Sequence, residues 1–243
     1  MSTSSVPIIV TRAEPGARQT REHLEALGLN VVSTPMLTLD LLPETQLPDA
    51  QDLAGLVFTS ANGVRTYAER RSDRALTTWC VGPATAEAAR HAGFPDIRES
   101  AGNAVDLANL ISAHATPSDG PLLHVANAAA TGTLKQTLTR LGFDVRFAPL
   151  YAMRPADTLP DSLKQLIDRG APAIVLIHSA KGATALANVT QAPQLKTWHL
   201  VAISEQACAP LVSLARGGTH IATAPNEAGL MRALDQALAT LSA

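Results

Sequence analysis

The chain has few of the residues from which disulfide frameworks, zinc sites and nucleic-acid interfaces are built. Its 243 residues include only two cysteines, Cys80 and Cys208, without CxxC spacing or a nearby histidine pair. Neither a disulfide framework nor a zinc site is therefore expected, and a reducing compartment is predicted. The formal net charge is −2 and the basic residues are scattered, so no nucleic-acid partner is expected.

Segments that target or cross membranes are also missing from the sequence. No apolar run approaches the ~20 residues that span a bilayer, and the first seven residues lack the basic and apolar regions of a signal peptide. We therefore expect a cytoplasmic protein with no membrane partner.

The hydrophobic fraction of 46% is ordinary for a folded chain. A chain of this length is expected to form two domains of roughly 110 to 120 residues each.

The common signatures of nucleotide and metal chemistry do not occur. The sequence contains no GxGxxG, GxxxxGK[ST], HExxH, GxSxG or DxDxDG pattern, which disfavours those reaction classes. The histidines are scattered without ligand spacing, so surface or packing roles are favoured for them. His124 and His178, near the ends of predicted strands, are weaker candidates for a functional role.

Short apolar runs alternate with helix-like segments along the whole chain. Strands separated by helices form parallel sheets, and continuously apolar strands are typical of sheets covered by helices on both faces. Doubly wound α/β sheets are therefore predicted. The predicted strands are Ile8–Val10, Val31–Ser33, Leu56–Thr59, Trp79–Val81, Leu122–Val125, Val145–Ala148, Ile174–His178, Leu200–Ile203 and His220–Thr223.

The sequence resembles itself in several places, in the same order. Similarity between any two strand-helix-strand stretches is the alternative explanation, but the number of ordered matches favours a duplicated α/β unit. The matches are Ser60 with Ser179 and Trp79 with Trp198 at an offset of 119, Leu27–Val31 with Leu141–Val145 at an offset of 114, and Asn103–Leu107 with Asn226–Leu230.

Small polar residues follow many of the predicted strands. Open α/β sheets bind ligands at the carboxyl ends of their strands. Each such residue alone is more often a helix N-cap than a ligand contact, but the amino terminus of a helix also presents free amides to an anion. Several helix termini facing one cleft would hold a polycarboxylate. The candidates are Thr11, Thr59, Ser60, Asn62, Gly82, Thr85, Ser179 and Ser204.

Five segments resemble the uroporphyrinogen-III synthases from end to end: VTRAEPGA, LVFTSANGV, CVGPATAEAARHAGF, LGFDVRFAPLY and IVLIHSAKG. The most specific pieces are the VTR start, the FTSANGV turn and the VGPATA turn. The resemblance implies two α/β domains joined by a two-stranded linker, with the ligand in the cleft between them. The implied boundaries are 1–36 with 154–243 for the first domain, 42–148 for the second, and 37–41 and 149–153 for the linkers.

The resemblance also implies the reaction. The family's substrate is hydroxymethylbilane, a linear tetrapyrrole polycarboxylate that is closed with loss of water and inversion of the last pyrrole ring, as a carbon-oxygen lyase does, without metal or organic cofactor. Tyr151 matches the family's linker tyrosine and is expected to assist the leaving hydroxyl, with packing at a domain edge as the alternative. Arg12, Arg65 and Lys181 would bind carboxylates or be solvated. A monomer is the family's default.

Two turns depart from the family's pattern. The chain has Ser204-Glu205-Gln206-Ala207 where Gly-Pro-Thr-Thr is usual, and Val125 to Ala128 where an Arg-Gly pair is common. Both changes weaken the case for substrate contacts there, because Glu205 would bring negative charge to a carboxylate site unless it points to solvent. The alternative function is a non-catalytic ligand-binding or regulatory module on the same two-lobed fold.

Overall fold

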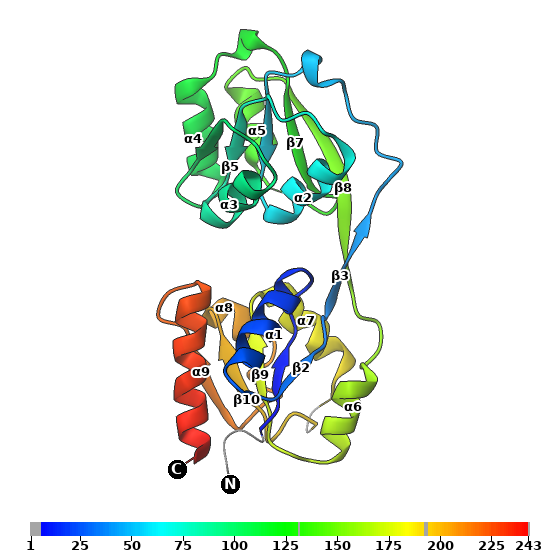
Figure 1. Cartoon of the computed structure of the whole chain (residues 1–243), viewed down its shortest axis with the longest axis vertical. Helices are drawn as coiled ribbons and strands as arrows, with labels where there is room; N and C mark the ends of the chain where they lie inside the picture. Colours follow the sequence, from blue (N-terminus) through cyan, green and yellow to red (C-terminus); the bar gives the residue numbers. More distant parts are fainter. Residues whose placement is uncertain (1–5, 131, 192–193, 243) are drawn as a thin grey trace. The chain divides into compact units, whose positions relative to one another are not determined.

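The computed structural model describes residues 6–130, 132–191 and 194–242, which fold into two helix-covered sheets (Figure 1). Contacts within the chain divide it into two compact units. Unit 1 comprises Met1–Leu39 and Arg154–Ala243, and unit 2 comprises Asp40–Met153.

The elements follow one another as strand, turn and helix in both units. Unit 1 contains β1 (Ile8–Val10), α1 (Gly16–Ala26), β2 (Val31–Ser33), α6 (Asp161–Asp168), β9 (Ile174–Ile177), α7 (Ala180–Val189), β10 (His199–Ala202), α8 (Glu205–Cys208), β11 (Gly218–Ile221) and α9 (Glu227–Ser242). Unit 2 contains β4 (Gly55–Phe58), α2 (Ala61–Arg70), β5 (Thr78–Cys80), α3 (Pro83–His91), β6 (Ile97–Glu99), α4 (Ala104–His114), β7 (Leu122–Asn127) and α5 (Leu134–Arg140), with short 3₁₀ helices η2 (Ala50–Asp52) and η3 (Pro117–Asp119). Strands β3 (Leu37–Leu41) and β8 (Val145–Pro155) cross the boundary between the units.

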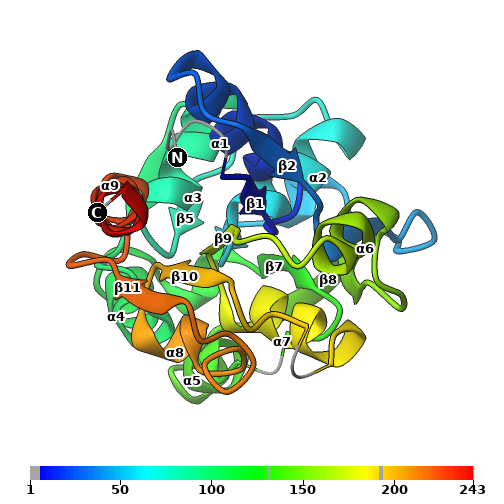
Figure 2. The ribbon, with the colours of Figure 1, turned by 90° about the horizontal axis from the view of Figure 1, so that it is seen from below.

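The sheet of unit 1 has the strand order β11-β10-β9-β1-β2, and its strands are parallel. Successive residues of a strand face opposite sides, so the continuous apolar runs feed two cores. Ile9 and Val175 pack under α6, α7 and α8, whereas Ile8 and Ile174 pack under α1 and α9. Figure 2 shows these two helical layers on opposite faces of the sheet.

The sheet of unit 2 has the strand order β3-β8-β7-β4-β5-β6, and β4 to β8 run parallel. Helices α2 and α3 cover one face and α4 and α5 the other. Strand β3 runs antiparallel to β8. The Leu42 N–H donates to the Leu150 carbonyl at 2.9 Å, and the Ala156 N–H donates to the Met36 carbonyl at 3.0 Å. The two segments that connect the units are therefore paired with each other.

The predicted fold class is confirmed, and each of the nine predicted strands overlaps an observed one. The sequence did not predict β6, which is three residues long and partly exposed at the edge of its sheet. The apolar runs did not predict β3 or the continuation of β8 beyond Ala148, which only the two-stranded linker of the resemblance implied. In the described part of the chain both cysteines are buried and free, and no helix has the length and apolar character to span a membrane.

Candidate active site

Ser60 and Tyr151 form a close side-chain pair at the carboxyl edge of the unit 2 sheet. Ser60 follows β4 in extended conformation, with φ −160°, and its Oγ accepts a hydrogen bond from the Gly63 N–H at 3.1 Å. The serine therefore caps α2, as a small hydroxyl residue in this position should. The same Oγ lies 2.6 Å from the Tyr151 Oη. One serine thus serves both the helix and the phenol.

An irregularity in the sheet aims Tyr151 at this turn. Strands β7 and β8 pair in register up to Ala126 and Pro149, after which Asn127 lies opposite Tyr151. One residue of β8 is skipped, as in a bulge, and bulges redirect side chains beside functional sites. The Ala128 N–H then donates to the Tyr151 carbonyl at 2.8 Å. The tyrosine is held by its backbone as well as by its hydroxyl.

The Tyr151 phenol is suited to donate a proton or hydrogen bond. It is 4% exposed, and burial raises its pKa, while hydrogen bonds from the Ser60 side chain and the Asn127 backbone offset part of that rise. A phenol with a raised pKa stays protonated at neutral pH.

Thr59 and His124 form a second pair in unit 2, beside the first. The Thr59 Oγ1 lies 3.3 Å from the His124 Nε2, and the imidazole stands edge-on to Phe147 with ring centroids 5.6 Å apart. Burial and the nearby Lys135 charge lower the pKa of His124 to about 4, so the ring is neutral at pH 7. His124, Lys135 and Phe147 also line a pocket of about 300 Å³.

The other predicted residues of unit 2 lie in the turns that begin α2 and α3. The Asn62 Oδ1 accepts a hydrogen bond from the Arg65 Nη1 at 3.2 Å, and the Asn62 Nδ2 lies 4.0 Å from the Met153 Sδ. Gly82 is the N-cap of α3, and Thr85 in the first turn is 4% exposed. The structure therefore brings Thr59, Ser60, Asn62 and Tyr151 together, while Gly82 and Thr85 belong to the neighbouring turn.

In unit 1 the side chains of the predicted hydroxyl residues form hydrogen bonds with backbone groups. The Thr11 Oγ1 is buried and donates to the Leu176 carbonyl at 2.9 Å. Ser179 caps α7 by accepting from the Gly182 N–H, and Ser204 caps α8 by accepting from the Ala207 N–H, both at 3.2 Å. Ser179 and Ser204 accept these bonds and keep their O–H groups free to donate, and their turns lie at the carboxyl edge of the sheet.

The charged candidates of unit 1 differ in their surroundings. Lys181, in the first turn of α7, is exposed. Glu205 is also exposed, at the first position of α8, where the helix dipole favours a negative charge. Arg12 instead contacts Glu227, with the Arg12 Nη1 3.1 Å from the Glu227 Oε2. Sequence reasoning missed this glutamate, which lies 215 positions away along the chain.

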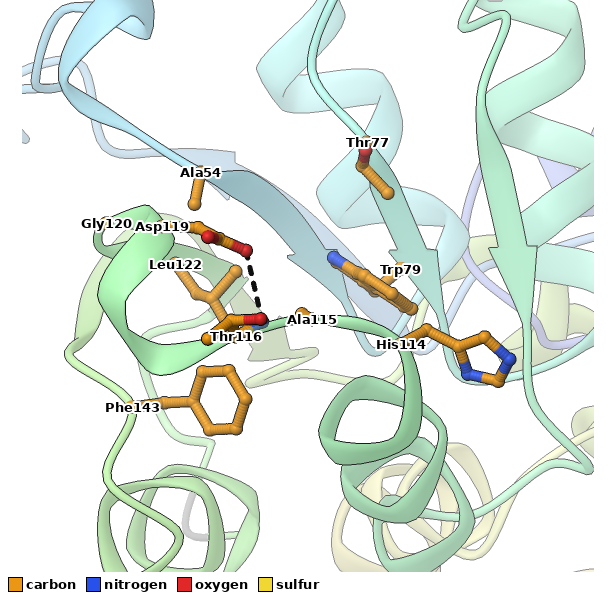
Figure 3. A pocket seen from close by; sticks show the side chains of 10 residues that line it. All are labelled: Ala54, Thr77, Trp79, His114, Ala115, Thr116, Asp119, Gly120, Leu122 and Phe143. Atoms are coloured by element: carbon orange, nitrogen blue, oxygen red, sulfur yellow. Dashed lines mark hydrogen bonds between the residues drawn. The ribbon is translucent and has the colours of Figure 1, made fainter.

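A second pocket of unit 2 lies at the opposite edge of its sheet. It measures about 100 Å³ and is lined by residues at the starts of β4, β5 and β7 together with the segment after α4 (Figure 3). Asp119, which accepts a hydrogen bond from the Thr116 N–H at 3.1 Å, forms part of its wall. The pocket shares no residue with the hydroxyl pairs at the carboxyl edge, so the candidate site lies at the other end of the strands.

Comparisons with known proteins identify the family of the chain. The family model described as "Uroporphyrinogen-III synthase HemD" matches residues 18–232, most of the chain. The chain belongs to the uroporphyrinogen-III synthase family. This family comprises lyases of tetrapyrrole biosynthesis, so the predicted family, enzyme class and pathway are confirmed. No curated protein sequence gives a significant match.

Solved structures of the family share the fold at low sequence identity. The uroporphyrinogen-III synthetase of Helicobacter pylori is 15% identical, with a TM-score of 0.64 over 95% of this chain and 99% of the other. A mutant uroporphyrinogen III synthase from Thermus thermophilus is 16% identical, with a TM-score of 0.56 over 97% of this chain and 100% of the other. Both likenesses support the same two-sheet α/β fold.

Proposed function

We propose that the chain closes hydroxymethylbilane to uroporphyrinogen III, with loss of water and inversion of the last pyrrole ring. Family membership supports the reaction, and the contact between Ser60 and Tyr151 is the observation that supports the site. A small-molecule substrate follows from the family.

Tyr151 is proposed to donate a hydrogen bond to the departing hydroxyl of the substrate. Its raised pKa keeps the proton available, and the contact with Ser60 fixes the direction of the phenol oxygen. The pyrrole nitrogen of the substrate supplies the electrons that expel water, so a weak acid in the correct place is sufficient. No strongly acidic side chain is required at this position.

Orientation of the flexible substrate is the larger task, because closure without assistance yields the symmetric isomer I. We propose that the turns at the carboxyl edges of both sheets bind the acetate and propionate side chains through backbone amides and short polar side chains. Arg12 and Lys181 add positive charge in unit 1. The proposed substrate-binding residues are Thr11, Arg12, Thr59, Ser60, Asn62, Gly82, Thr85, Ser179, Lys181 and Ser204.

The proposed domains are 1–36 with 154–243, and 42–148, joined by 37–41 and 149–153. The division of contacts at Leu39 and Met153 and the pairing of β3 with β8 support these boundaries. We further propose that the protein acts as a monomer, in line with the family's default, and that it works in the cytoplasm, where its two free cysteines would stay reduced.

The test is to incubate the purified chain with freshly generated hydroxymethylbilane and to resolve the product isomers. A synthase produces isomer III faster than isomer I forms without protein. A chain that yields isomer I at the uncatalysed rate is instead the non-catalytic module that the atypical Ser204 turn allows.

A further inference from the structure

A carboxylate is already bound at the carboxyl edge of unit 1, and it belongs to the chain itself. The Glu227 Oε2 lies 3.1 Å from the Arg12 Nη1, and the Glu227 Oε1 accepts a hydrogen bond from the Thr20 Oγ1 at 3.0 Å. Arg12 also donates to the Thr20 Oγ1 at 3.3 Å. Both carboxylate oxygens are therefore held, by a guanidinium and a hydroxyl that also contact each other.

The position of the Arg12 guanidinium depends on a glycine. A Cβ added to Gly16 would lie 2.6 Å from both the Cζ and the Nη2 of Arg12, so the guanidinium occupies the space that any other residue would fill. Gly16 begins α1, where the helix dipole is positive and repels a cation. A neighbouring anion offsets that repulsion. The arrangement thus favours a negative group on the far side of the arginine.

His178 faces the same carboxylate. Its side chain is 9% exposed, and the His178 Nε2 lies 3.4 Å from the Glu227 Oε2. Among the described residues, neither ring nitrogen of His178 makes a hydrogen bond of good geometry. Burial lowers the pKa of His178 and Glu227 offsets this in part, so the ring is neutral and has one N–H to donate. A buried donor without a partner is costly, and a better-placed carboxylate oxygen would satisfy it.

Space for another carboxylate adjoins these side chains. Arg12, Gln19, Thr20, His23 and Glu227 line a pocket of about 270 Å³, several times the ~30 Å³ share of one water molecule. Glu227 is the first residue of α9 and its side chain is 44% exposed, so it has a route to solvent. Burial raises the pKa of Glu227, but its contacts with His178, Arg12 and Thr20 outweigh this and lower the pKa to about 2, so the carboxylate is charged at neutral pH. A second carboxylate would take over the same contacts, so exchanging one partly exposed ion pair for another costs only ~0–1 kcal/mol.

We propose that Arg12, Thr20 and His178 form a carboxylate-binding site, which Glu227 occupies as an internal ligand until a carboxylate-bearing ligand displaces it. The ligand is either an acetate or propionate side chain of the bilane or a small free carboxylate. The first case rests on the function proposed above, and the second does not. Glu227 then sets the affinity of the site by competition.

The direct test uses sodium propionate as the probe and sodium chloride at equal ionic strength as its control. His178 ring signals are followed by NMR, and a His178→Gln variant identifies them. Propionate should bind Glu227→Gln more tightly than the parent by roughly three- to tenfold, because the competing charge is gone. Arg12→Gln should not bind propionate at all.

A matched control is available in unit 2, where Glu99 lies 3.1 Å from the Arg90 Nη2 in another partly exposed ion pair. Glu99→Gln should leave propionate binding unchanged. The proposal is overturned if Glu227→Gln and the parent respond to propionate alike and have the same KM for the bilane. Since this comparison needs only Glu227→Gln, a folding failure of Arg12→Gln does not affect it.

The bilane assay separates the two sources of the carboxylate. A lower KM for Glu227→Gln at unchanged kcat, not seen for Glu99→Gln, assigns the site to the substrate. Propionate binding with an unchanged KM assigns it to a free carboxylate. If no variant or parent produces isomer III, the proposed function fails, and the propionate titration still decides whether the site exists.

Discussion

Strand β4 and helix α2 of unit 2 match strand β9 and helix α7 of unit 1 residue by residue, at an offset of 119 (174 − 55 = 119). Ser60 and Ser179 begin these helices with nearly the same backbone angles, φ −160° and −162°, and each accepts a hydrogen bond from the glycine three residues on. On the other flank of each sheet, β1 with β2 matches β7 with β8 at an offset of 114. The duplication predicted from the sequence is therefore confirmed.

The two units differ in the side chains at equivalent positions of their matching strands and helices. Tyr151 of unit 2 has Leu37 as its counterpart in unit 1, and His124 has Val10. Thr59 has His178 as its counterpart, and that histidine faces Glu227. The caps belong to the fold, because both units keep them. The Tyr151 phenol and the Glu227 carboxylate each occur in one unit only, so they are the better candidates for a specific function.

The largest effect of a single side chain should appear in the response of unit 2 to acid. His124 has a pKa of about 4 in the folded chain and an ordinary value near 6.5 when unfolded. The unfolded state therefore binds the proton first as pH falls, and unit 2 should lose roughly 3 kcal/mol of stability between pH 7 and pH 4. His124→Val, which installs the residue of unit 1, should remove most of this loss.

Each unit contains one tryptophan, Trp79 in unit 2 and Trp198 in unit 1, so fluorescence reports on each unit separately. Denaturant unfolding of Trp198→Phe, which retains Trp79, measures unit 2 at a series of pH values. A stability of unit 2 that does not change between pH 7 and pH 4 would contradict a neutral His124.

Tyr151→Phe should slow turnover by roughly 10- to 100-fold, the contribution of one weak acid. The product should still be isomer III, because orientation comes from the many contacts of the turns. Tyr67→Phe is the matched control, since Tyr67 is 2% exposed and packs edge-on to Phe58 with centroids 5.9 Å apart. Parental turnover in Tyr151→Phe would remove the acid role, and release of isomer I would remove the orientation argument.

Gly63 and Gly182 occupy equivalent positions but have different surroundings. A Cβ at Gly63 would lie 2.9 Å from the Val125 carbonyl oxygen, which cannot move without the strand, whereas a Cβ at Gly182 would meet only the Ser179 Oγ at 3.4 Å. Gly63→Ala should therefore destabilise unit 2 by about 1–3 kcal/mol. Gly182→Ala should be neutral or stabilise unit 1 by up to ~1 kcal/mol through helix propensity. Unfolding followed at Trp79 or Trp198 measures each effect, and equal losses would show that the strand contact does not matter.

The strands and helix caps were predicted from the sequence better than the side-chain contacts of the site, for a physical reason. Apolar runs such as Ile174 to His178 and serine caps such as Ser60 are local signals, read within about ten residues. The pairing of Ser60 with Tyr151 joins residues 91 positions apart, and that of Thr20 with Glu227 joins residues 207 positions apart. Tyr151 was found through its resemblance to the family. His178 was named only as a weaker candidate near the end of a predicted strand. Thr20 and Glu227 were missed because ordinary surface helices carry the same residue types.

The smallest effects come from the two serine caps and separate folding from function most directly. Ser60→Ala and Ser179→Ala each remove the acceptor for one helix amide, and each should cost its unit about 1 kcal/mol. Ser60→Ala also releases Tyr151, so it should slow turnover more than Ser179→Ala does, by roughly three- to tenfold for one hydrogen bond. Ser60→Gly distinguishes the two effects, because glycine at an N-cap costs only a few tenths of a kcal/mol. Its stability should approach the parent's while its turnover stays as low as that of Ser60→Ala. If Ser60→Gly instead recovers parental turnover, Ser60 acts only as a cap and Tyr151 needs no partner to hold its hydroxyl.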